Sequence, residues 1–244
     1  MDLIIMKVYG MSNGVWLLTI LLSVVAIVIS GDLAGQGDYQ KDSLIFQDNF
    51  DTDLSDWVVE NKLSDESKVE IRDGQLLIDV NSGATIWCKQ KLFGNLLIEF
   101  NRKVVMGDGA NDRLSDFNFF WMATDPRNES LFNRDGTFAQ YDSLSLYYVG
   151  IGGNYNSTTR FRKYMGTGER FLLQEKNDEK HLLQPNQSYF VQVVICNGTT
   201  KVFVNGEEYF TYDDPDPLTE GYFGFRTVKS RQEIEDIHIY SIRL

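Results

Sequence analysis

Residues 142–164 read DSLSLYYVGIGGNYNSTTRFRKY, and this stretch decides the fold. Its first part has the alternation of period two that a β-strand requires. A loop rich in glycine and asparagine follows over residues 150–156, and residues 159–164 form a second strand pattern. The predicted faces of the first strand are Ser143, Ser145, Tyr147 and Val149 on one side and Leu144, Leu146 and Tyr148 on the other.

The second strand pattern places Arg160, Arg162 and Tyr164 on one face. Two arginines and a tyrosine are unsuited to a core face, where an apolar set is expected. Guanidinium groups bind carboxylates in a forked geometry, and tyrosine offers both a ring and a hydroxyl. We therefore expect this face either to hold an anionic or hydroxyl-rich ligand or to lie in solvent with its arginines paired to acids.

Short strand patterns separated by turn signals continue along the chain, and no stretch has a sustained helical period. The charged segment 169–183 is predicted to form no more than a turn of helix. The expected strands cover residues 44–46, 69–71, 75–80, 85–91, 96–105, 116–123, 143–149, 159–164, 188–196, 200–204, 207–212, 222–226 and 233–242. This pattern predicts an all-β protein, an antiparallel sandwich or barrel that forms a single domain over residues 44–244.

The N-terminal region contains an uninterrupted apolar run, VWLLTILLSVVAIVI at residues 15–29, behind Lys7. The run is shorter than a membrane span of about 20 residues and fits the apolar core of a signal peptide. Residues 1–30 are predicted to be a signal peptide cleaved after Ser30, or else an uncleaved anchor, and residues 31–43 a polar tether. We expect the domain to be exported, without a stable membrane span unless the anchor stays uncleaved.

The chain has 244 residues and a formal net charge of −12, which removal of residues 1–30 leaves unchanged. Nucleic acids and anionic membranes require basic patches, so neither is expected as a partner. A local basic cleft at Arg160 and Arg162 remains compatible with an acidic substrate. The sequence leaves open whether Cys88 and Cys196 form a disulfide or stay free.

Residues 46–244 resemble exported jelly-roll domains of the concanavalin A-like group. The resemblance rests on the opening FQDNFDTDLSDWVVEN, on LLQPNQSYFVQVVICNGTTKVFVNGEEYFTYDD and on the closing GYFGFRTVKSRQEIEDIHIYSIRL. Within that group, TIWCKQKL, FNFFWMATDP and YYVGIGGNYNSTTRFRKY are similar to a family of exported bacterial proteins related to YesU, which is associated with plant cell-wall polysaccharide use. The resemblance implies two curved antiparallel sheets whose concave face binds carbohydrate. It implies no single activity, because this fold hosts lyases, hydrolases and lectins.

Lyase chemistry needs a base for the proton beside a uronate carboxyl and groups that neutralise the carboxylate. Jelly-roll lyases use tyrosine or histidine as base or acid, and arginine, asparagine or glutamine as the neutralising group. The resemblance thus implies Arg160 or Arg162 on the carboxylate, Asn118 as its helper, and Tyr147 or Tyr164 as the base. An ordinary tyrosine titrates near pH 10, so such a site must lower that pKa or polarise the hydroxyl.

Five further residues are assigned to substrate binding. Trp87 and Lys89 share a predicted strand face, where the ring would stack on a sugar and the lysine would neutralise a uronate. The alternative is a tryptophan packed under a loop beside a surface lysine. Asp116 is a candidate acid or base or a turn residue, and Asn154 lies in the loop of the central stretch. His181 either reaches the same cleft or is structural.

The strand pattern at residues 116–123 separates a core stripe from a face of mixed character. The expected core stripe is Phe117, Phe119, Trp121 and Ala123, and the mixed face is Asp116, Asn118, Phe120 and Met122. The expected chemistry requires no cofactor. Sandwiches of this group often hold a structural calcium ion, and on that resemblance alone Asp48 and Asp236 are candidate ligands.

The sequence thus predicts an exported carbohydrate-active protein that binds a polysaccharide or oligosaccharide, and we expect it to be a monomer. The favoured activity is a polysaccharide lyase that cleaves an acidic polysaccharide by β-elimination. The alternative is a non-catalytic carbohydrate-binding module. A glycoside hydrolase ranks below both, because the Glu-x-Asp-x-Glu strand of jelly-roll hydrolases is absent.

Overall fold

The computed structural model describes residues 39–62, 64 and 66–244. The predicted signal peptide or anchor, and the first part of the predicted tether, lie outside the described residues. The end of that tether is instead part of the first strand, which begins at Gln40 and pairs Lys41 with Ile242. In the part of the chain that the structure describes, no helix is both long and apolar enough to cross a membrane.

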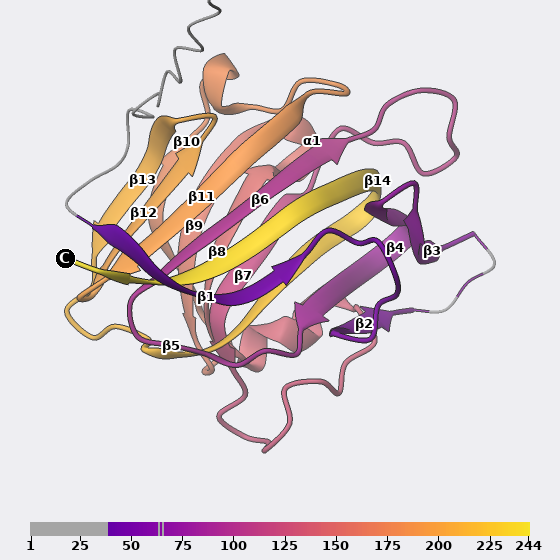
Figure 1. Ribbon diagram of the computed structural model, residues 1–244. Helices are drawn as coiled ribbons and strands as arrows, with labels where there is room; N and C mark the ends of the chain where they lie inside the picture. The colour runs from indigo at the N-terminus through magenta and orange to yellow at the C-terminus, as the bar shows by residue number, and fades with distance from the viewer. Residues whose placement is uncertain (1–38, 63, 65) are drawn as a thin grey trace, which may run out of the picture. The chain divides into compact units, whose positions relative to one another are not determined.

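The described strands form two antiparallel layers, which confirms the expected sandwich (Figure 1). The back sheet runs in the order β10-β9-β8-β7-β14-β4-β2, and the front sheet in the order β13-β12-β11-β6-β14-β1. The back strands are β2 (Trp57–Asn61), β4 (Gln75–Cys88), β7 (Phe117–Thr124), β8 (Ser145–Gly152), β9 (Thr158–Met165) and β10 (Arg170–Lys176). The front strands are β1 (Gln40–Asp48), β6 (Leu96–Val104), β11 (Ser188–Cys196), β12 (Thr199–Val204) and β13 (Glu207–Asp213).

Strand β14 (Glu220–Arg243) belongs to both layers. Its first part lies between β7 and β4, and its second part pairs with β6 and β1. The small strands β3 (Lys68–Arg72) and β5 (Leu92–Phe93) pair with β4 and with the start of β14. Three short helices lie in the described connections between strands: η1 (Phe138–Ser143), α1 (Gly153–Asn156) and η2 (Glu179–His181).

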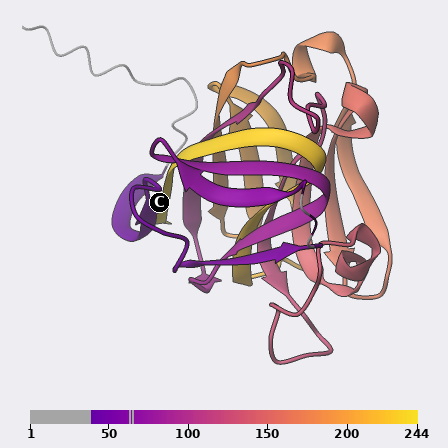
Figure 2. The same ribbon diagram turned by 90° about the vertical axis from the view of Figure 1, so that its right-hand side faces the viewer.

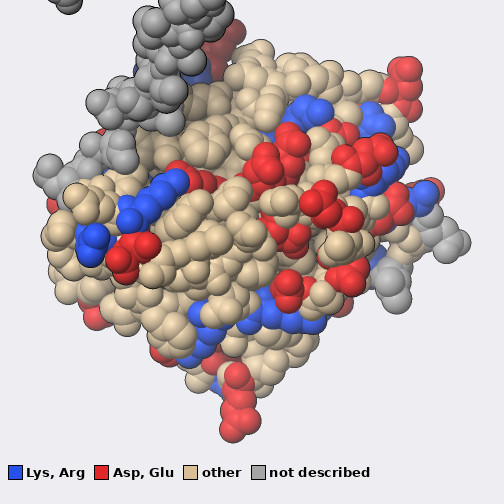
Figure 3. All heavy atoms as spheres, in the orientation of Figure 1, with Lys and Arg blue, Asp and Glu red and all other residues tan. Residues whose placement is uncertain are grey.

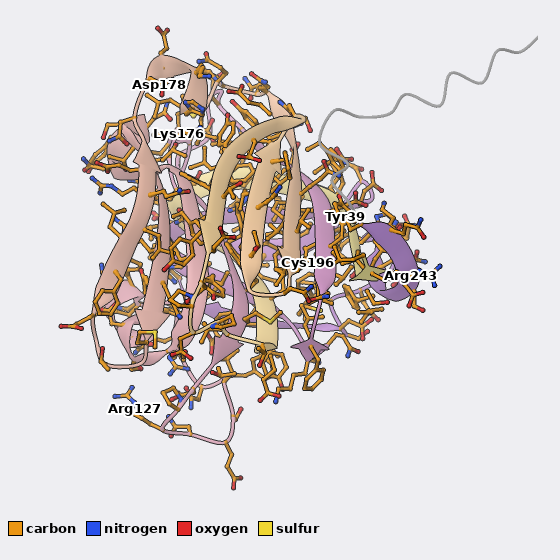
Figure 4. All side chains as sticks on the ribbon, turned by 90° about the vertical axis from the view of Figure 1, so that its left-hand side faces the viewer. Tyr39, Arg127, Lys176, Asp178, Cys196 and Arg243 are labelled. Carbon is orange, nitrogen blue, oxygen red and sulfur yellow. The ribbon has the colours of Figure 1, made fainter. Side chains whose placement is uncertain are left out.

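The main hydrophobic core fills the space between the layers. Inward side chains of the front sheet, such as Phe100 and Val191, meet those of the back sheet, such as Phe119 and Val149. Cys88 is buried there, and Cys196, labelled in Figure 4, is half-buried at the end of β11. Both cysteines are free, so of the two alternatives that the sequence left open, the structure has the unbridged one.

A β-bulge in β7 corrects the predicted faces of that strand. Met122 has a positive φ of 51°, and the pairing of β7 with β8 shifts register between Trp121 and Thr124. The extra residue breaks the alternation. Met122 therefore packs in the main core, while Ala123 joins a second apolar cluster outside the back sheet, the reverse of the prediction.

Two predicted boundaries are also corrected. Residues 75–80 and 85–91 are one strand, β4, which ends at Cys88, and the last two predicted strands, 222–226 and 233–242, are parts of β14. Residues 170–176 form strand β10 rather than a helical turn, because their backbone pairs with β9 despite the charged side chains. Only η2 corresponds to the predicted turn of helix.

Candidate functional site

A row of polar side chains crosses the outer face of the back sheet. Arg226 of β14 pairs with Asn118 of β7, and Tyr148 of β8 pairs with Arg162 of β9. Asn118 in turn pairs with Gly150, two residues beyond Tyr148. Because residues two apart on a strand share a face, Arg226, Asn118, Tyr148 and Arg162 lie on one side of the sheet. We call these four residues the polar strip.

Tyr148 and Asn118 form the centre of the polar strip. The Tyr148 hydroxyl donates a hydrogen bond to Asn118 Oδ1 at 2.9 Å, and these residues keep 6% and 3% of their surface exposed. Gly150 lies beside them, and a β-carbon at this position would be only 2.4 Å from the Tyr148 hydroxyl. A side chain at residue 150 would therefore displace the hydroxyl, so glycine is needed for this close approach.

The two arginines predicted to bind a carboxylate share a face of β9 but differ in their partners. Arg160 Nε donates to Glu175 Oε2 of β10 at 2.8 Å, and both side chains are partly exposed. The Arg162 guanidinium lies 5.6 Å from the centre of the Tyr148 ring, and none of the described acids pairs with it. The charge of Arg162 is thus available to a ligand, whereas Glu175 compensates that of Arg160.

Arg226 is a second arginine of the polar strip without an acidic partner among the described residues. Its fully buried guanidinium donates to Thr85 Oγ1 at 2.8 Å and to the carbonyl of Gly136 at 3.0 Å. Nε has no acceptor in the described part of the chain. Burial lowers the pKa of Arg226, but a guanidinium remains protonated at neutral pH. A buried charge without a counter-ion is costly, so an anion bound nearby would be stabilised.

A third arginine holds the polar strip from inside the sandwich. Arg102 of β6 is buried, and its Nε donates to Gln232 Oε1 at 2.6 Å. Its two terminal nitrogens donate to the carbonyls of Asn118 at 2.6 Å and Arg226 at 3.0 Å. These carbonyls belong to two strip residues whose side chains leave the opposite face of the sheet. Arg102 therefore fixes the backbone on which the strip is built.

Tyr164, one of the two predicted bases, lies on the same face as the polar strip. Its ring stacks on that of Tyr148 with centroids 5.9 Å apart, and its hydroxyl is buried with no partner within the described residues. Burial raises the pKa of both tyrosines, so each is a neutral phenol near pH 7. Of the two, only Tyr148 keeps any exposed surface from which it could reach a ligand.

Tyr147, the other predicted base, points into the core, away from the arginines. Its hydroxyl donates to Asp214, which also pairs with Lys163 Nζ at 2.7 Å. Burial raises the pKa of Tyr147, and the bond to Asp214 raises it further. With Leu218 it lines a separate cavity of about 290 Å³. The prediction that Tyr147 joins the arginines is wrong, and its neighbour Tyr148 takes that place because strand side chains alternate.

Trp87 is completely buried, so it offers no exposed ring to a sugar. Its indole N–H donates to Glu60 Oε2 at 2.8 Å, and the Tyr141 hydroxyl donates to the same oxygen. The ring packs against Phe120, in a cluster that the connection after β7 covers. The structure thus has the alternative that the sequence left open, a tryptophan packed under a loop.

Two other predicted binding residues lie near one end of the polar strip. Asp116 precedes β7 with a φ of 60° and pairs with Arg113. Burial raises the pKa of Asp116 although Arg113 acts to lower it, and Arg226 is close enough to contribute in the same sense. Asn154 is exposed in α1, where its amide bonds to Ser157.

Lys89 and His181 lie away from the polar strip. Lys89 follows the end of β4, and its Nζ donates to the carbonyl of Ser55 at 2.6 Å. His181 is buried in η2, where Nδ1 contacts the Asp178 carboxylate at 2.7 Å. Asp178, labelled in Figure 4, lies at the end of the molecule opposite Arg127. The structural interpretation of His181 thus matches its position.

The candidate calcium ligands are engaged differently. Asp48 accepts hydrogen bonds on both carboxylate oxygens, from the Phe50 amide and from the Trp57 indole, each at 2.7 Å. Asp236 is exposed in β14, beside a register shift of the strand. Across residues 39–62, 64 and 66–244, no group of three or more acids, histidines and cysteines is arranged to hold a metal ion.

An exposed aromatic residue that sequence reasoning missed stands at the same end as Asp116. Tyr155 is 78% exposed, and the Arg113 guanidinium lies 5.3 Å from its ring centre. Tyr155 and its neighbours Asn154 and Asn156 all have positive φ values near 55°. This conformation is rare for a bulky residue, and such strain concentrates at functional positions. In Figure 2, α1 and η1 both lie outside the back sheet, near its opposite ends.

The charge of the molecule is unevenly distributed. Figure 3 shows the front face, where acidic side chains gather over the region of β14 and β3. The polar strip, with its two arginines that lack acidic partners among the described residues, lies on the other layer. A local site for an anion is thus compatible with the net charge of −12.

Comparison with known proteins places the chain in a family without an assigned function. The profile of a family described as a domain of unknown function, DUF6250, matches residues 78–237. The chain belongs to this family. The matched segment contains all four residues of the polar strip. No curated protein matches the sequence.

Solved structures show the same fold at low sequence identity. A Bacillus subtilis protein of unknown function with a galectin-like fold superposes with a TM-score of 0.70 at 17% identity, over 84% of this chain and 98% of that one. A carbohydrate-binding module, CBM66 of Bacillus subtilis, gives 0.54 at 11% identity, over 76% and 96%. LamA of Zobellia galactanivorans, in complex with laminaritriose and laminaritetraose, gives 0.59 at 11% identity, over 83% and 100%. These similarities confirm the jelly-roll β-sandwich.

Proposed function

We propose that this protein binds an acidic, uronate-containing polysaccharide at the polar strip, and that it cleaves this polysaccharide by β-elimination. The observation that carries the proposal is the presence of two guanidinium groups, Arg162 and Arg226, with no carboxylate partner among the described residues. Uncompensated charges inside a protein favour binding of the opposite charge. A planar carboxylate also matches the forked donors of arginine.

The carbohydrate part of the proposal draws on the fold as well. Similar structures include a carbohydrate-binding module and several glucanases. The proposed relation to the YesU-related family, with export and a role in polysaccharide use, points in the same direction. Hydrolysis requires two carboxyl groups flanking the bond to be cleaved. The polar strip itself contains no carboxyl group, which favours elimination over hydrolysis.

In the proposed reaction Arg162 binds the uronate carboxylate, and Asn118 donates from its amide. With the carboxylate neutralised, the proton on the adjacent carbon becomes more acidic. Tyr148 first releases its own proton to solvent, which the nearby charge of Arg162 favours, and the phenolate then takes the proton of the substrate. The electron pair left on this carbon forms the new double bond, and the bond to the neighbouring glycosidic oxygen breaks. The leaving oxygen then receives a proton from Tyr148 or from water.

A non-catalytic binding module is the second candidate. The observation that favours it is the burial of Tyr148, which raises the pKa of the only strip residue able to act as a base. Arg162 lowers the same pKa, and a bound uronate would change the balance again. Binding would require the arginines alone, whereas elimination also requires the phenolate.

The decisive measurement is ultraviolet absorbance of the purified protein mixed with pectic, alginate, glucuronan and glycosaminoglycan polysaccharides. A rise from an unsaturated uronate would establish elimination, and it should be lost in Tyr148→Phe. Binding to one polysaccharide without this rise, and without new reducing ends, would leave the binding module. Absence of binding to every acidic polysaccharide of the panel would overturn both.

The two arginines of β9 provide a matched pair of variants. Arg162→Gln is expected to weaken binding by about 10- to 100-fold, because it removes a charged hydrogen bond to the ligand. Arg160→Gln removes a charge that Glu175 compensates, so its effect should be less than about threefold. Isothermal titration with the polysaccharide selected above measures both. Equal losses in the two variants would place the carboxylate elsewhere.

A further inference from the structure

Residues 125–143 connect β7 to β8, and they cover part of the outer face of the back sheet. We call them the wall segment. Its backbone touches β4 at Gly136 and Gly83: a β-carbon on Gly83 would be 2.1 Å from the Gly136 carbonyl oxygen. The Gly136 carbonyl also accepts the hydrogen bond from Arg226. The wall segment therefore lies directly on the sheet at β4 and β14.

Buried polar contacts fasten the wall segment to β2. Glu60 of β2 accepts from the backbone N–H of Arg134 and from the hydroxyl of Tyr141, each at 2.8 Å. The Glu60 residue is only 3% exposed, so this anchor is shielded from water. Hydrogen bonds to a buried carboxylate are stronger than those between neutral groups. The wall segment is thus fixed over β2, β4 and the first part of β14.

The wall segment is also braced internally. Arg134 pairs with Asp125, and their side chains are 5% and 0% exposed. Arg134 further donates to the carbonyls of Leu131 at 2.7 Å and Gln140 at 2.9 Å. One buried guanidinium thus ties the beginning, middle and end of the segment together. A segment held in this way acts as a fixed barrier rather than as a loop that opens for each ligand.

On the side of β10, the wall segment reaches Arg170 at the start of that strand, which pairs with Asp142 at 2.6 Å. Beyond Asn118 and Arg162, the outer face leads to residues that keep solvent exposure, including Arg160, Glu175 and Asp116. Tyr155 of α1 stands at this side with its ring 78% exposed. An aromatic ring is the surface on which the apolar face of a sugar stacks. In the described part of the chain, the outer face is therefore closed at β14 and at the start of β10, and open toward α1 and the end of β10.

We propose that the site takes the end of a glycan chain: the terminal uronate lies at the polar strip against the wall segment, and the next sugar extends over Tyr155. This inference rests on the proposed function and adds to it the part of the polymer that is recognised. A groove that accepted the middle of a chain would need an exit on both sides. The wall segment removes the exit across β14, β4 and β2.

Binding stoichiometry tests the proposal directly. The acidic polysaccharide selected by the panel is separated into a short and a long fraction, and each is titrated calorimetrically with the protein. Binding at the chain end gives one protein per chain for both fractions, with the same dissociation constant per chain. Binding within the chain gives several proteins per long chain, which would overturn the proposal while leaving the proposed function intact.

Two substitutions of exposed aromatic residues test whether the second sugar lies over Tyr155 or whether any exposed ring contributes to binding. Tyr155→Ala is expected to weaken binding of an oligosaccharide by about three- to tenfold, because it removes a stacking surface, and to leave binding of the free monosaccharide uronate unchanged. Phe93→Ala is the matched control, since Phe93 is 57% exposed and has Lys91 5.1 Å from its ring centre. Equal effects of both variants, or no effect of Tyr155→Ala, would remove Tyr155 from the site.

The outcomes also separate this inference from the function on which it rests. No binding to any acidic polysaccharide or uronate by the native protein would overturn the function and the inference together. Another outcome is that the native protein binds in proportion to the mass of polysaccharide rather than to the number of its chains, while Arg162→Gln does not bind. This result would overturn the inference alone and leave the proposed function intact. One protein per chain, with the Tyr155 effect confined to oligosaccharides, is the expected result.

Discussion

Asp214 and Lys163 form an ion pair that is almost completely removed from water, with side chains 4% and 8% exposed. Burial acts to raise the pKa of Asp214, but the hydrogen bonds from Lys163 and Tyr147 together hold it below its ordinary value. A carboxyl group whose pKa is lower in the folded state stabilises the protein fully above its unfolded pKa. That contribution is lost as the pH falls through the folded pKa.

Asp214→Asn would leave Lys163 buried without a counter-ion. We expect the free energy of unfolding at pH 7 to fall by about 3 kcal/mol. Between about pH 5 and pH 2 the variant should also lose less stability than the native protein, because it lacks the titrating group. Urea unfolding over a pH series measures both, and the exposed Asp213→Asn is the control. Identical pH profiles for the native protein and Asp214→Asn would contradict the assignment.

Arg102 gives a second prediction at the scale of single residues. Arg102→Lys keeps the charge but loses the fork that reaches the carbonyls of Asn118 and Arg226. We expect the free energy of unfolding to fall by about 2 kcal/mol, and binding at the polar strip to weaken as well. Arg243→Lys, at a side chain 66% exposed, should change stability by less than about 0.5 kcal/mol. A loss of stability without any change in binding would show that Arg102 does not position the strip.

Single residues also show what the sequence could and could not predict. The shared face of Arg160, Arg162 and Tyr164 follows from alternation alone. The partner of Arg162 across the next strand depends on the register between β8 and β9, which alternation does not specify. The choice between Tyr147 and Tyr148 therefore needed the structure. Arg226 is far from the central stretch in the chain, and no local pattern connects it with Asn118.

Among the structural elements, the wall segment has the most specific sequence requirement. Its contact with β4 is possible because Gly83 and Gly136 lack side chains, and each β-carbon would be closer than 2.5 Å to the other residue's carbonyl oxygen. In the sequence these residues are two of twenty glycines, without a pattern that relates them. The strands around these glycines were predictable from the alternation of their side chains. The position of the wall segment on the back sheet was not predictable from any such pattern.

Gly83→Ala is predicted to separate the wall segment from β4. The added methyl group would be 2.1 Å from the Gly136 carbonyl oxygen, so the segment must move, and the free energy of unfolding should fall by about 2 kcal/mol. Trp87 would lose part of its cover, which shifts tryptophan emission to longer wavelength. Gly107→Ala is the control, because its nearest atom would be 3.4 Å away. Native emission from a folded Gly83→Ala protein would contradict the close contact.

The predicted bounds of strands and helices were wrong where the pairing of the backbone outweighed the pattern of the side chains. The charged segment at residues 170–176 forms β10 because the edge of β9 offers hydrogen-bond partners. The bulge at Met122 reverses two residues of β7, and neither neighbour is a glycine that would signal a bulge. The jelly-roll class itself was predictable, because it depends on many alternating strands rather than on any one of them.

At the scale of the whole molecule, the net charge of −12 opposes the approach of an acidic polysaccharide, while the polar strip attracts it at short range. Long-range repulsion is screened within about 10 Å at 0.1 M salt, whereas contacts at a partly buried site are screened less. Added salt should therefore change the association of the polysaccharide and its dissociation through different interactions.

We predict that the association rate constant rises when salt is increased from low concentration to about 0.1 M, because screening weakens the repulsion. The dissociation rate constant should rise as well, as the contact between Arg162 and the carboxylate weakens. Surface plasmon resonance with the immobilised polysaccharide measures both rates. An association rate constant that falls with salt would show that the strip, rather than the net charge, governs the encounter.

Strand β14 joins β7 to β4 in the back sheet and β6 to β1 in the front sheet. During synthesis, the strands before residue 220 have no partner that links β7 to β4 or β6 to β1. Neither sheet can therefore be completed before β14 is made, although distant pairs such as β6 with β11 do not need it. A nascent chain would keep both sheets incomplete until residues 220–243 have been added. Such a delay would suit the export that we propose, in which the polypeptide would pass unfolded through a translocation pore.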